Sequence, residues 1–450
     1  MDRNRHLEQT DKACIWHPFT QMKQWQEMTP VVIEEGRGEF LKDIYGRWYL
    51  DGVASLWVNV HGHRKKEIDE AIKAQIDRIS HSTLLGLANV PSVELAERLI
   101  KIVPKGLTRV FYSDNGSTSV EIALKMAFQY WKNRGVQGKD AFVCLNNAYH
   151  GDTIGAVSVG GIDLFHEIYR PLLFKTYRVP SPYCYRCELG LEPSTCGLKC
   201  LEAVEEVLSK HHNEIAAIIL EPLVQGAGGM IVHPAGYLKG VRELTKRYNV
   251  LLIADEVAVG FGRTGRMFAC EHEDVVPDFL CLSKGITGGY LPLAVTVTTD
   301  EVYNAFLGEY RELKTFFHGH SYTGNPLACA ASLANLELFE KEKTLEGVNK
   351  KATILGKWLD EIKELRHVGD ARGIGLIGGV ELVEDKKSKK PYAFELQMGY
   401  RVCNSAREKG LLIRPLGNVI VIMPPLCISE ENLQKMLSII KDSIVEVTEG

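Results

Sequence analysis

The stretch that decides the fold runs from residue 251 to residue 289 and reads LLIADEVAVGFGRTGRMFACEHEDVVPDFLCLSKGITGG. It begins within one short apolar run, Val250–Ala254, and contains a second, Phe279–Leu282. Such runs, bounded by polar residues or glycines, are typical of strands buried on both faces of a parallel sheet. Asp255 follows the first run directly, and Lys284 lies just beyond the second. Ligands of open α/β sheets bind beyond the carboxyl ends of the strands, so we expect these two side chains to face one site.

The same alternation continues towards both ends of the chain. Further apolar runs predict strands, and apolar residues spaced three or four positions apart predict the helices between them. The expected strands are Arg109–Tyr112, Ala141–Leu145 and Ala216–Leu220, and the expected helices are one with a capping box at Thr118–Glu121 and one over Tyr237–Arg247. Strands that alternate with helices predict an α/β fold with a mostly parallel sheet covered on both faces.

From about residue 330 the pattern changes, and the chain is typical of a separate, smaller α/β domain. We expect helices over Asn325–Lys343 and Lys350–Leu365, strands over Gly373–Val383 and Val419–Met423, and a last helix from Glu430. The lysine-rich DKKSKK at 385–390 predicts a solvated turn between extended segments.

Composition excludes several classes of protein. The chain has 450 residues, of which 45% are hydrophobic and 24% charged, so it has ample material for a core and is not disordered. The net charge of −4 favours neither nucleic acid nor an anionic membrane as a partner. No apolar run approaches the ~20 residues that span a bilayer. The polar N-terminus is no signal peptide, and eleven cysteines without an export signal indicate a reducing cytoplasm.

Several side chains together have the chemistry to bind one cofactor. A glycine and hydroxyls in SDNGSTSVE, residues 113–121, open a helix whose N–H groups can bind a phosphate, although a plain helix cap is an alternative. Lys284 can form a Schiff base with an aldehyde, and Asp255 can keep a pyridinium nitrogen protonated. Tyr149 can stack on a ring. These are the requirements of pyridoxal 5′-phosphate (PLP). A dinucleotide site is not indicated, because no GxGxxG follows a strand.

At this point the sequence resembles the class-III PLP-dependent aminotransferases over essentially its whole length. The segments that carry the resemblance are 251–289, SDNGSTSVEIALKMA at 113–127, AYHGDT at 148–153, EPLVQGAGGM at 221–230 and HGHSYTGNPLACA at 318–330. The resemblance implies fold-type I and a homodimer with shared active sites. It also implies three parts: an N-terminal segment, 1–60, that packs with the small domain, a large PLP-binding domain, 61–330, and a small domain, 331–450.

The resemblance also implies roles for individual residues. Lys284 would be the lysine that binds PLP covalently and transfers the proton, and Asp255 would pair with the pyridine nitrogen. Gly116 and Ser117 would hold the phosphate, and Tyr149 would stack on the ring.

Two further residues of the site are implied less directly. Ser321 matches the phosphate-binding threonine that the other subunit contributes. Glu221 lies near the cofactor in the family, without a firmly transferable role.

Three further segments resemble the branch of the family that works in biotin biosynthesis. They are IWHPFTQM at 15–22, DGVASLWVNVHGH at 51–63 and LLIRPLGNVIVIMPPL at 411–426. The implied reaction is amino transfer to 7-keto-8-aminopelargonate, giving 7,8-diaminopelargonate. Arg414 would bind the carboxylate of that acceptor, with a surface ion pair as the alternative. Phe19, Trp57 and Gly319 would line the substrate pocket, and a plain core residue is the alternative for Trp57.

The amino donor stays open between S-adenosylmethionine and lysine. Leu56 and Phe19 stand where the enteric-type enzymes carry a tryptophan and a tyrosine. A rival activity is another ω-aminotransferase acting on ornithine, 4-aminobutyrate or a polyamine. A rival from another class is a PLP-binding regulator.

The cysteines fall into two groups. Four form a C-x2-C-x8-C-x3-C pattern, which has the donors for a structural Zn²⁺, with free thiols in a loop as the alternative. These four are Cys184, Cys187, Cys196 and Cys200. The other seven lie in or beside apolar segments and are expected to be small core residues. They are Cys14, Cys144, Cys270, Cys281, Cys329, Cys403 and Cys427.

Overall fold

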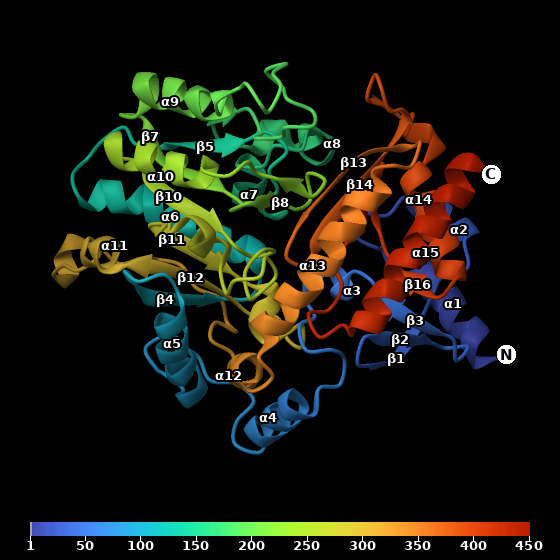
Figure 1. Ribbon diagram of the computed structural model, residues 1–450. Helices are drawn as coiled ribbons and strands as arrows, with labels where there is room; N and C mark the ends of the chain where they lie inside the picture. The colour runs from blue at the N-terminus through green and yellow to red at the C-terminus, as the bar shows by residue number, and fades with distance from the viewer. Residues whose placement is uncertain (1) are drawn as a thin grey trace.

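A computed structural model describes residues 2–450 and is built around a seven-stranded sheet, the large sheet (Figure 1). Its order is β4 (Leu107–Ser113), β12 (Ala294–Thr299), β11 (Phe279–Leu282), β10 (Leu251–Asp255), β7 (Ile215–Leu220), β5 (Ala141–Leu145) and β6 (Thr176–Val179). Strand β12 runs antiparallel to both of its neighbours, and the other pairings are parallel. The predicted α/β fold with a mostly parallel sheet is confirmed.

Both faces of the large sheet are buried, which explains why its strands are apolar throughout. In β7, Ile218 and Leu220 belong to one core cluster, whereas Ala217 and Ile219 belong to another. Helix α6 (Gly116–Asn133) supplies apolar residues to the second cluster. Helices α9 (Lys199–His211) and α10 (Tyr237–Arg247) supply residues to the first. Alternate residues of a strand point to opposite faces, so a strand between two helical layers has no polar face.

The predicted capping box of the first long helix is wrong. The helix begins earlier, at Gly116, because the side chain of Asn115 accepts a hydrogen bond from the Thr118 N–H at 3.1 Å. Thr118 therefore closes the capping box instead of opening it. The Glu121 carboxylate does not take part in the capping box. It accepts a hydrogen bond from the Gly155 N–H at 2.7 Å. It thereby joins α6 to the segment that follows Tyr149.

The C-terminal part forms a second, five-stranded sheet, the small sheet, beside three helices. The strands are β13 (Val368–Ile374), β14 (Ile377–Asp385), β15 (Lys390–Pro391), β17 (Pro415–Leu416) and β18 (Val419–Ile422). The helices are α13 (Thr344–Ile362), α14 (Met398–Glu408) and α15 (Glu430–Glu449), and α12 (Pro326–Lys341) leads into them. The single strand predicted over Gly373–Val383 is wrong, because a turn at 375–376 divides it into an antiparallel hairpin. The turn at DKKSKK is confirmed.

Residues 2–60 lie against the C-terminal part. They contain α1 (Arg3–Cys14), α2 (Met22–Glu27), β1 (Ile33–Arg37), β2 (Phe40–Asp43), β3 (Trp48–Asp51) and the short turn α3 (Ala54–Trp57). Strand β3 pairs in parallel with β16 (Leu411–Leu412), and both chain ends lie on the same side of the molecule (Figure 1). The predicted division into residues 1–60, 61–330 and 331–450 stays a prediction. Within residues 2–450, no helix has the length and apolarity that a bilayer span requires.

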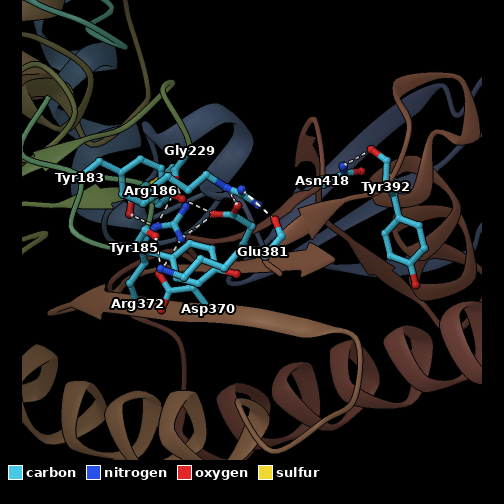
Figure 2. A network of polar contacts seen from close by, with 11 residues as sticks. Tyr183, Tyr185, Arg186, Gly229, Asp370, Arg372, Glu381, Tyr392 and Asn418 are labelled. Carbon is cyan, nitrogen blue, oxygen red and sulfur yellow. Dashed lines mark hydrogen bonds and ion pairs between the residues drawn. The ribbon is translucent and has the colours of Figure 1, made fainter. Parts of the chain in front are cut away.

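A buried polar network joins the small sheet to the loops beside the large sheet (Figure 2). Its centre is the Glu381 carboxylate on β14, which is 5% exposed. It accepts hydrogen bonds from the Arg372 guanidinium at 2.9 Å, from Arg186 at 2.5 Å and from the Tyr183 hydroxyl. Arg372 also donates to the carbonyl of Gly229. We call these five residues the Glu381 network, and they connect β13 and β14 with residues 183–186 and 229.

We expect Glu381→Ala to destabilise the protein strongly. Removing one partner of a buried ion pair costs about 3–5 kcal/mol. The change leaves the Arg186 guanidinium without its carboxylate partner and the Arg372 guanidinium with Asp370 alone. The matched control is Glu384→Ala on the same strand, because Glu384 forms an exposed ion pair with Lys390 and such pairs contribute about 0–1 kcal/mol. Urea unfolding measures both variants, and equal midpoints would contradict the expectation.

Candidate active site

The carboxyl ends of three adjacent strands open into one cavity of about 490 Å³. Asp255 ends β10, Glu221 follows β7, and Lys284 follows β11 after one serine. All three line the cavity, together with Gly116 and Ser117 from the start of α6. The large sheet therefore brings together side chains that are far apart in the sequence, as the pattern of strand ends predicted.

The amine of Lys284 is held away from bulk water. Desolvation lowers its pKa from 10.5 to about 8, against the opposing effect of the Asp255 and Glu221 carboxylates. The residue begins a short 3₁₀ helix with a φ of +47°, and its Nζ lies 4.7 Å from the centre of the Trp57 ring. A large fraction of the amine is therefore neutral near pH 8, the form that attacks an aldehyde or accepts a proton.

Two buried carboxylates flank this amine in different environments. Asp255 Oδ2 lies 2.7 Å from Nδ1 of His150, and Oδ1 accepts a hydrogen bond from a backbone N–H. Glu221 accepts hydrogen bonds from the backbone N–H groups of Tyr149 and Gly226. Burial nevertheless raises the pKa of Glu221 to about 7. The site thus has one carboxylate with a histidine partner and a second that gains a proton readily.

Tyr149 and the start of α6 form the remaining wall. The Tyr149 hydroxyl donates to Asp152 at 2.7 Å, and burial raises the pKa of this phenol above its usual range. Asp152 in turn donates its backbone N–H to the Ser117 hydroxyl at 3.2 Å. A Cβ at Gly151, whose φ is +117°, would lie 1.9 Å from that hydroxyl, so only glycine lets the loop approach Ser117.

These residues fit PLP by their chemistry. Helix α6 has 18 residues, and its first N–H groups, with the Ser117 hydroxyl, suit a phosphate. A lysine amine and a buried carboxylate face the same cavity, as an aldehyde and a pyridine nitrogen require.

The fold and these site residues together define a PLP-dependent transferase of fold-type I, and comparison with known proteins gives the family. The class-III aminotransferase family model matches residues 21–444. The chain therefore belongs to the class-III aminotransferases, which are PLP-dependent enzymes.

The relatives of the chain are similar over almost their whole length. The chain is 57% identical over 445 residues to an adenosylmethionine-8-amino-7-oxononanoate aminotransferase of Geobacter sulfurreducens, covering 99% of this chain and 98% of that protein. The crystal structure of the protein of that name from Methanocaldococcus jannaschii superposes with a TM-score of 0.94 at 50% identity, over 98% of this chain and 99% of that one. A transaminase from a marine Virgibacillus shares 33% identity and a TM-score of 0.91, with 99% coverage of both chains.

Three of the four predicted substrate-pocket residues line the same cavity, and Gly319 does not. Phe19, Trp57 and Arg414 all line the cavity. Among residues 2–450 no carboxylate forms an ion pair with Arg414, so the alternative of a surface ion pair finds no support. Ser321 and Gly319 are exposed and do not line this cavity of the single chain. Their predicted role in a site shared between subunits stays a prediction.

The segment that carries Trp57 has an unusual backbone. Four consecutive residues without a glycine, Ala54–Trp57, have φ values of 48°, 47°, 71° and 69°. We call them the left-handed turn. The Trp57 N–H donates to the carbonyl of Val53 at 2.7 Å, and the Val58 N–H donates to Ala54 at 3.0 Å. A left-handed helical conformation costs L-residues about 1–2 kcal/mol each, so surrounding contacts must hold this turn in place.

The cysteine predictions have mixed outcomes. Four of the presumed core thiols are fully buried, namely Cys144, Cys270, Cys281 and Cys329, and Cys403 is nearly so. Cys14 is exposed, because α1 has no buried residue, so that prediction is wrong. Cys427 is only partly buried.

The four loop cysteines lie beside one small cavity. Cys184, Cys187, Cys196 and Cys200 are partly buried, unpaired and line this cavity together. Over residues 2–450, however, no three metal-ligating side chains are grouped to hold an ion. Whether these thiols bind a metal stays a prediction.

Sequence reasoning missed His150 as the partner of Asp255, and it missed the left-handed turn. His150 follows Tyr149 directly in AYHGDT, so the motif itself contained the signal. Nothing in the letters of Ala54–Trp57 favours positive φ, so the turn left no signal in the sequence.

The lowered pKa of Lys284 predicts a pH-dependent stability. The unfolded chain binds more protons than the folded one between about pH 8 and 10.5, so this residue makes stability rise with pH across that window. In cofactor-free protein, Lys284→Met should therefore be more stable than the wild type at pH 7, by up to roughly 3 kcal/mol. The difference should shrink towards pH 10.5 in urea unfolding. Lys105→Met, at an exposed position, is the control, and a constant difference for Lys284→Met would contradict the prediction.

Proposed function

We propose that this protein transfers an amino group to 8-amino-7-oxononanoate, also called 7-keto-8-aminopelargonate, to give 7,8-diaminopelargonate in biotin biosynthesis. The observation that carries the proposal is the Arg414 guanidinium, which lines the same cavity as Lys284 and has no carboxylate partner in residues 2–450. A long acceptor with a terminal carboxylate fits a largely apolar cavity that has a guanidinium in its wall. Relatives at 50–57% identity are named for the same activity, which supports the proposal.

Each residue of the cavity has a separate role in the proposed amino transfer. PLP, when bound, supplies an aldehyde and an electron sink. The Asp255 carboxylate, oriented by His150, holds a proton on a nitrogen placed against it. The Lys284 amine, with a pKa near 8, accepts a proton from the substrate carbon and returns it. The Tyr149 ring and the Trp57 ring form walls that exclude water from this exchange.

The rival activities have less support. The ω-transaminase structures resemble the chain at 30–34% identity, well below the relatives of the first activity. A regulator without enzyme activity is not favoured, because the relatives that match over 98–99% of their length have enzyme names. We propose S-adenosylmethionine as the donor, because these relatives are named for it. Lysine is the alternative that Leu56 and Phe19 suggested.

We also propose a homodimer with shared active sites and a cytoplasmic location. Ser321 and Gly319 lie on an exposed segment that also displays Phe317 and Tyr322, which are 74% and 63% exposed. A segment with two exposed aromatic rings is suited to contact a second copy. The location is supported by the cysteines, all of which are unpaired thiols.

A direct assay tests the proposed activity. PLP-loaded protein is mixed first with S-adenosylmethionine or, separately, with lysine, and then with 8-amino-7-oxononanoate. We expect S-adenosylmethionine to convert the bound cofactor to its amine form, and the acceptor to restore it with formation of the diamine, measured by absorbance and mass spectrometry. Lys284→Ala should lower the rate by about 10²- to 10⁴-fold. Failure of the acceptor with both donors, while another keto substrate reacts, would refute the assignment.

Arg414→Ala should raise KM for the acceptor roughly 10- to 100-fold, because hydrogen bonds to charged groups contribute about 1.5–3 kcal/mol. In the wild type, KM for the methyl ester of the acceptor should exceed KM for the acid by the same factor. In Arg414→Ala, the KM values for ester and acid should be nearly equal. Arg401→Ala, an exposed arginine on α14, is the matched control. Equal KM values for acid and ester in the wild type would show that Arg414 binds no carboxylate.

A further inference from the structure

The buried carboxylate of Asp51 binds the left-handed turn on the side away from the cavity. Asp51 is 1% exposed and lies at the end of β3. Its Oδ1 accepts hydrogen bonds from the Ser55 N–H at 3.0 Å and from the Val53 N–H at 3.3 Å. Its Oδ2 accepts the Ser55 hydroxyl at 2.8 Å and lies 3.0 Å from Nε2 of His63. Both carboxylate oxygens of Asp51 thus bind Ser55 of the turn, and Oδ2 also contacts His63.

The opposite side of the turn faces the reaction cavity. Leu56 and Trp57 line it, and Nζ of Lys284 lies 4.7 Å from the centre of the Trp57 ring. A Cβ at Gly226 would lie 3.3 Å from the same ring, so there is little free space on that side as well. The position of the indole therefore depends on the backbone conformation of the turn.

We propose that Asp51 is a positioning residue of this active site, which acts through the left-handed turn to hold Trp57 and Leu56 against the substrate. The identity of the substrate in this inference rests on the proposed function. The effect of Asp51 on the conformation of the turn does not. Ala54, Ser55, Leu56 and Trp57 all prefer a negative φ, so the local sequence opposes the turn. Without the Asp51 hydrogen bonds the segment relaxes, and the two pocket side chains lose their place.

This role differs from that of the groups that transfer protons. Asp51 does not line the cavity, so its removal leaves Lys284 and Asp255 present. A misplacement of about 1 Å can cost on the order of 100-fold in rate. We expect Asp51→Ala to lower kcat/KM roughly 10- to 100-fold, mainly through KM for 8-amino-7-oxononanoate. Asp51→Asn, which keeps an oxygen for the Ser55 N–H, should lose less.

The chain offers a matched control in Asp43, at the end of the neighbouring strand β2. This carboxylate is 6% exposed and also clamps a turn, since it accepts hydrogen bonds from the N–H groups of Tyr45 and Arg47 and from the Tyr49 hydroxyl, each at 2.9 Å. That turn does not line the cavity. Asp43→Ala should lower the unfolding midpoint while leaving KM within about twofold of the wild type, on the premise that distant sites act independently.

Two double variants separate positioning from general destabilisation. In a Trp57→Leu background the effect of Asp51→Ala on KM should largely disappear, because both changes act on the same contact. Glycine adopts a positive φ without penalty, so adding Ser55→Gly to Asp51→Ala should reverse part of the increase in KM. Additive effects of Asp51→Ala and Trp57→Leu, or a KM no higher than that of Asp43→Ala, would overturn the proposal.

Hydrogen exchange supplies a readout that needs no substrate. Backbone amides 53–59 should exchange faster in PLP-loaded Asp51→Ala than in the wild type, and Ser55→Gly alone should change them less. Unchanged exchange would overturn the positioning role even if the proposed reaction holds. Faster exchange in a protein that does not use 8-amino-7-oxononanoate would instead refute the proposed function and leave the role of Asp51 standing. If Asp51→Ala does not fold, Asp51→Asn carries the same comparison.

Discussion

Removal of the Lys284 amine from bulk water is the interaction on which the rest of the site depends. Desolvation favours the neutral amine, and the carboxylates of Asp255 and Glu221 keep the pKa from falling further, so the amine titrates near pH 8. All three residues lie where adjacent strands of the large sheet end, and the order β11-β10-β7 sets their spacing. The two apolar layers around the sheet fix those ends, which links the packing of the core to the acid–base behaviour of one lysine.

The small sheet contributes through contacts around the cavity. Arg372 of the Glu381 network donates to the Gly229 carbonyl, and the same loop contains Gly226, which borders the Trp57 ring. On the other side of the indole, the left-handed turn is joined to β3, which pairs with β16. The pocket wall is therefore fixed from two directions, by a buried ion network and by a clamped turn, while the catalytic side chains come from the large sheet.

Much of this arrangement could be predicted from the sequence, because it depends on local patterns. The apolar runs before Asp255 and Lys284 predicted strand ends at one site, and α10 was predicted with its observed bounds. Competition between neighbouring residues was harder to predict: Asn115 displaces Thr118 as the cap of α6, and a two-residue turn divides 373–383 into a hairpin. The left-handed turn binds Asp51, and its Trp57 ring lies beside Lys284 and Gly226, contacts that no local pattern of residues 54–57 encodes. Whether Ser321 serves a second subunit depends on a partner chain.

The exposure of Cys14 gives the molecule a spectroscopic handle. Burial raises the pKa of Cys144, Cys270, Cys281 and Cys329 well above that of a free thiol, so these thiols are both inaccessible and poor nucleophiles. Among the cysteines of residues 2–450, Cys14 is the one that is exposed, and it is the last residue of α1 in the N-terminal segment. With the partly buried thiols of Cys184, Cys187, Cys196, Cys200 and Cys427 replaced by serine, a maleimide spin label would attach at one defined point per chain. The distance between two such labels would measure how copies of the protein are arranged, without engineering any cysteine into or out of the core.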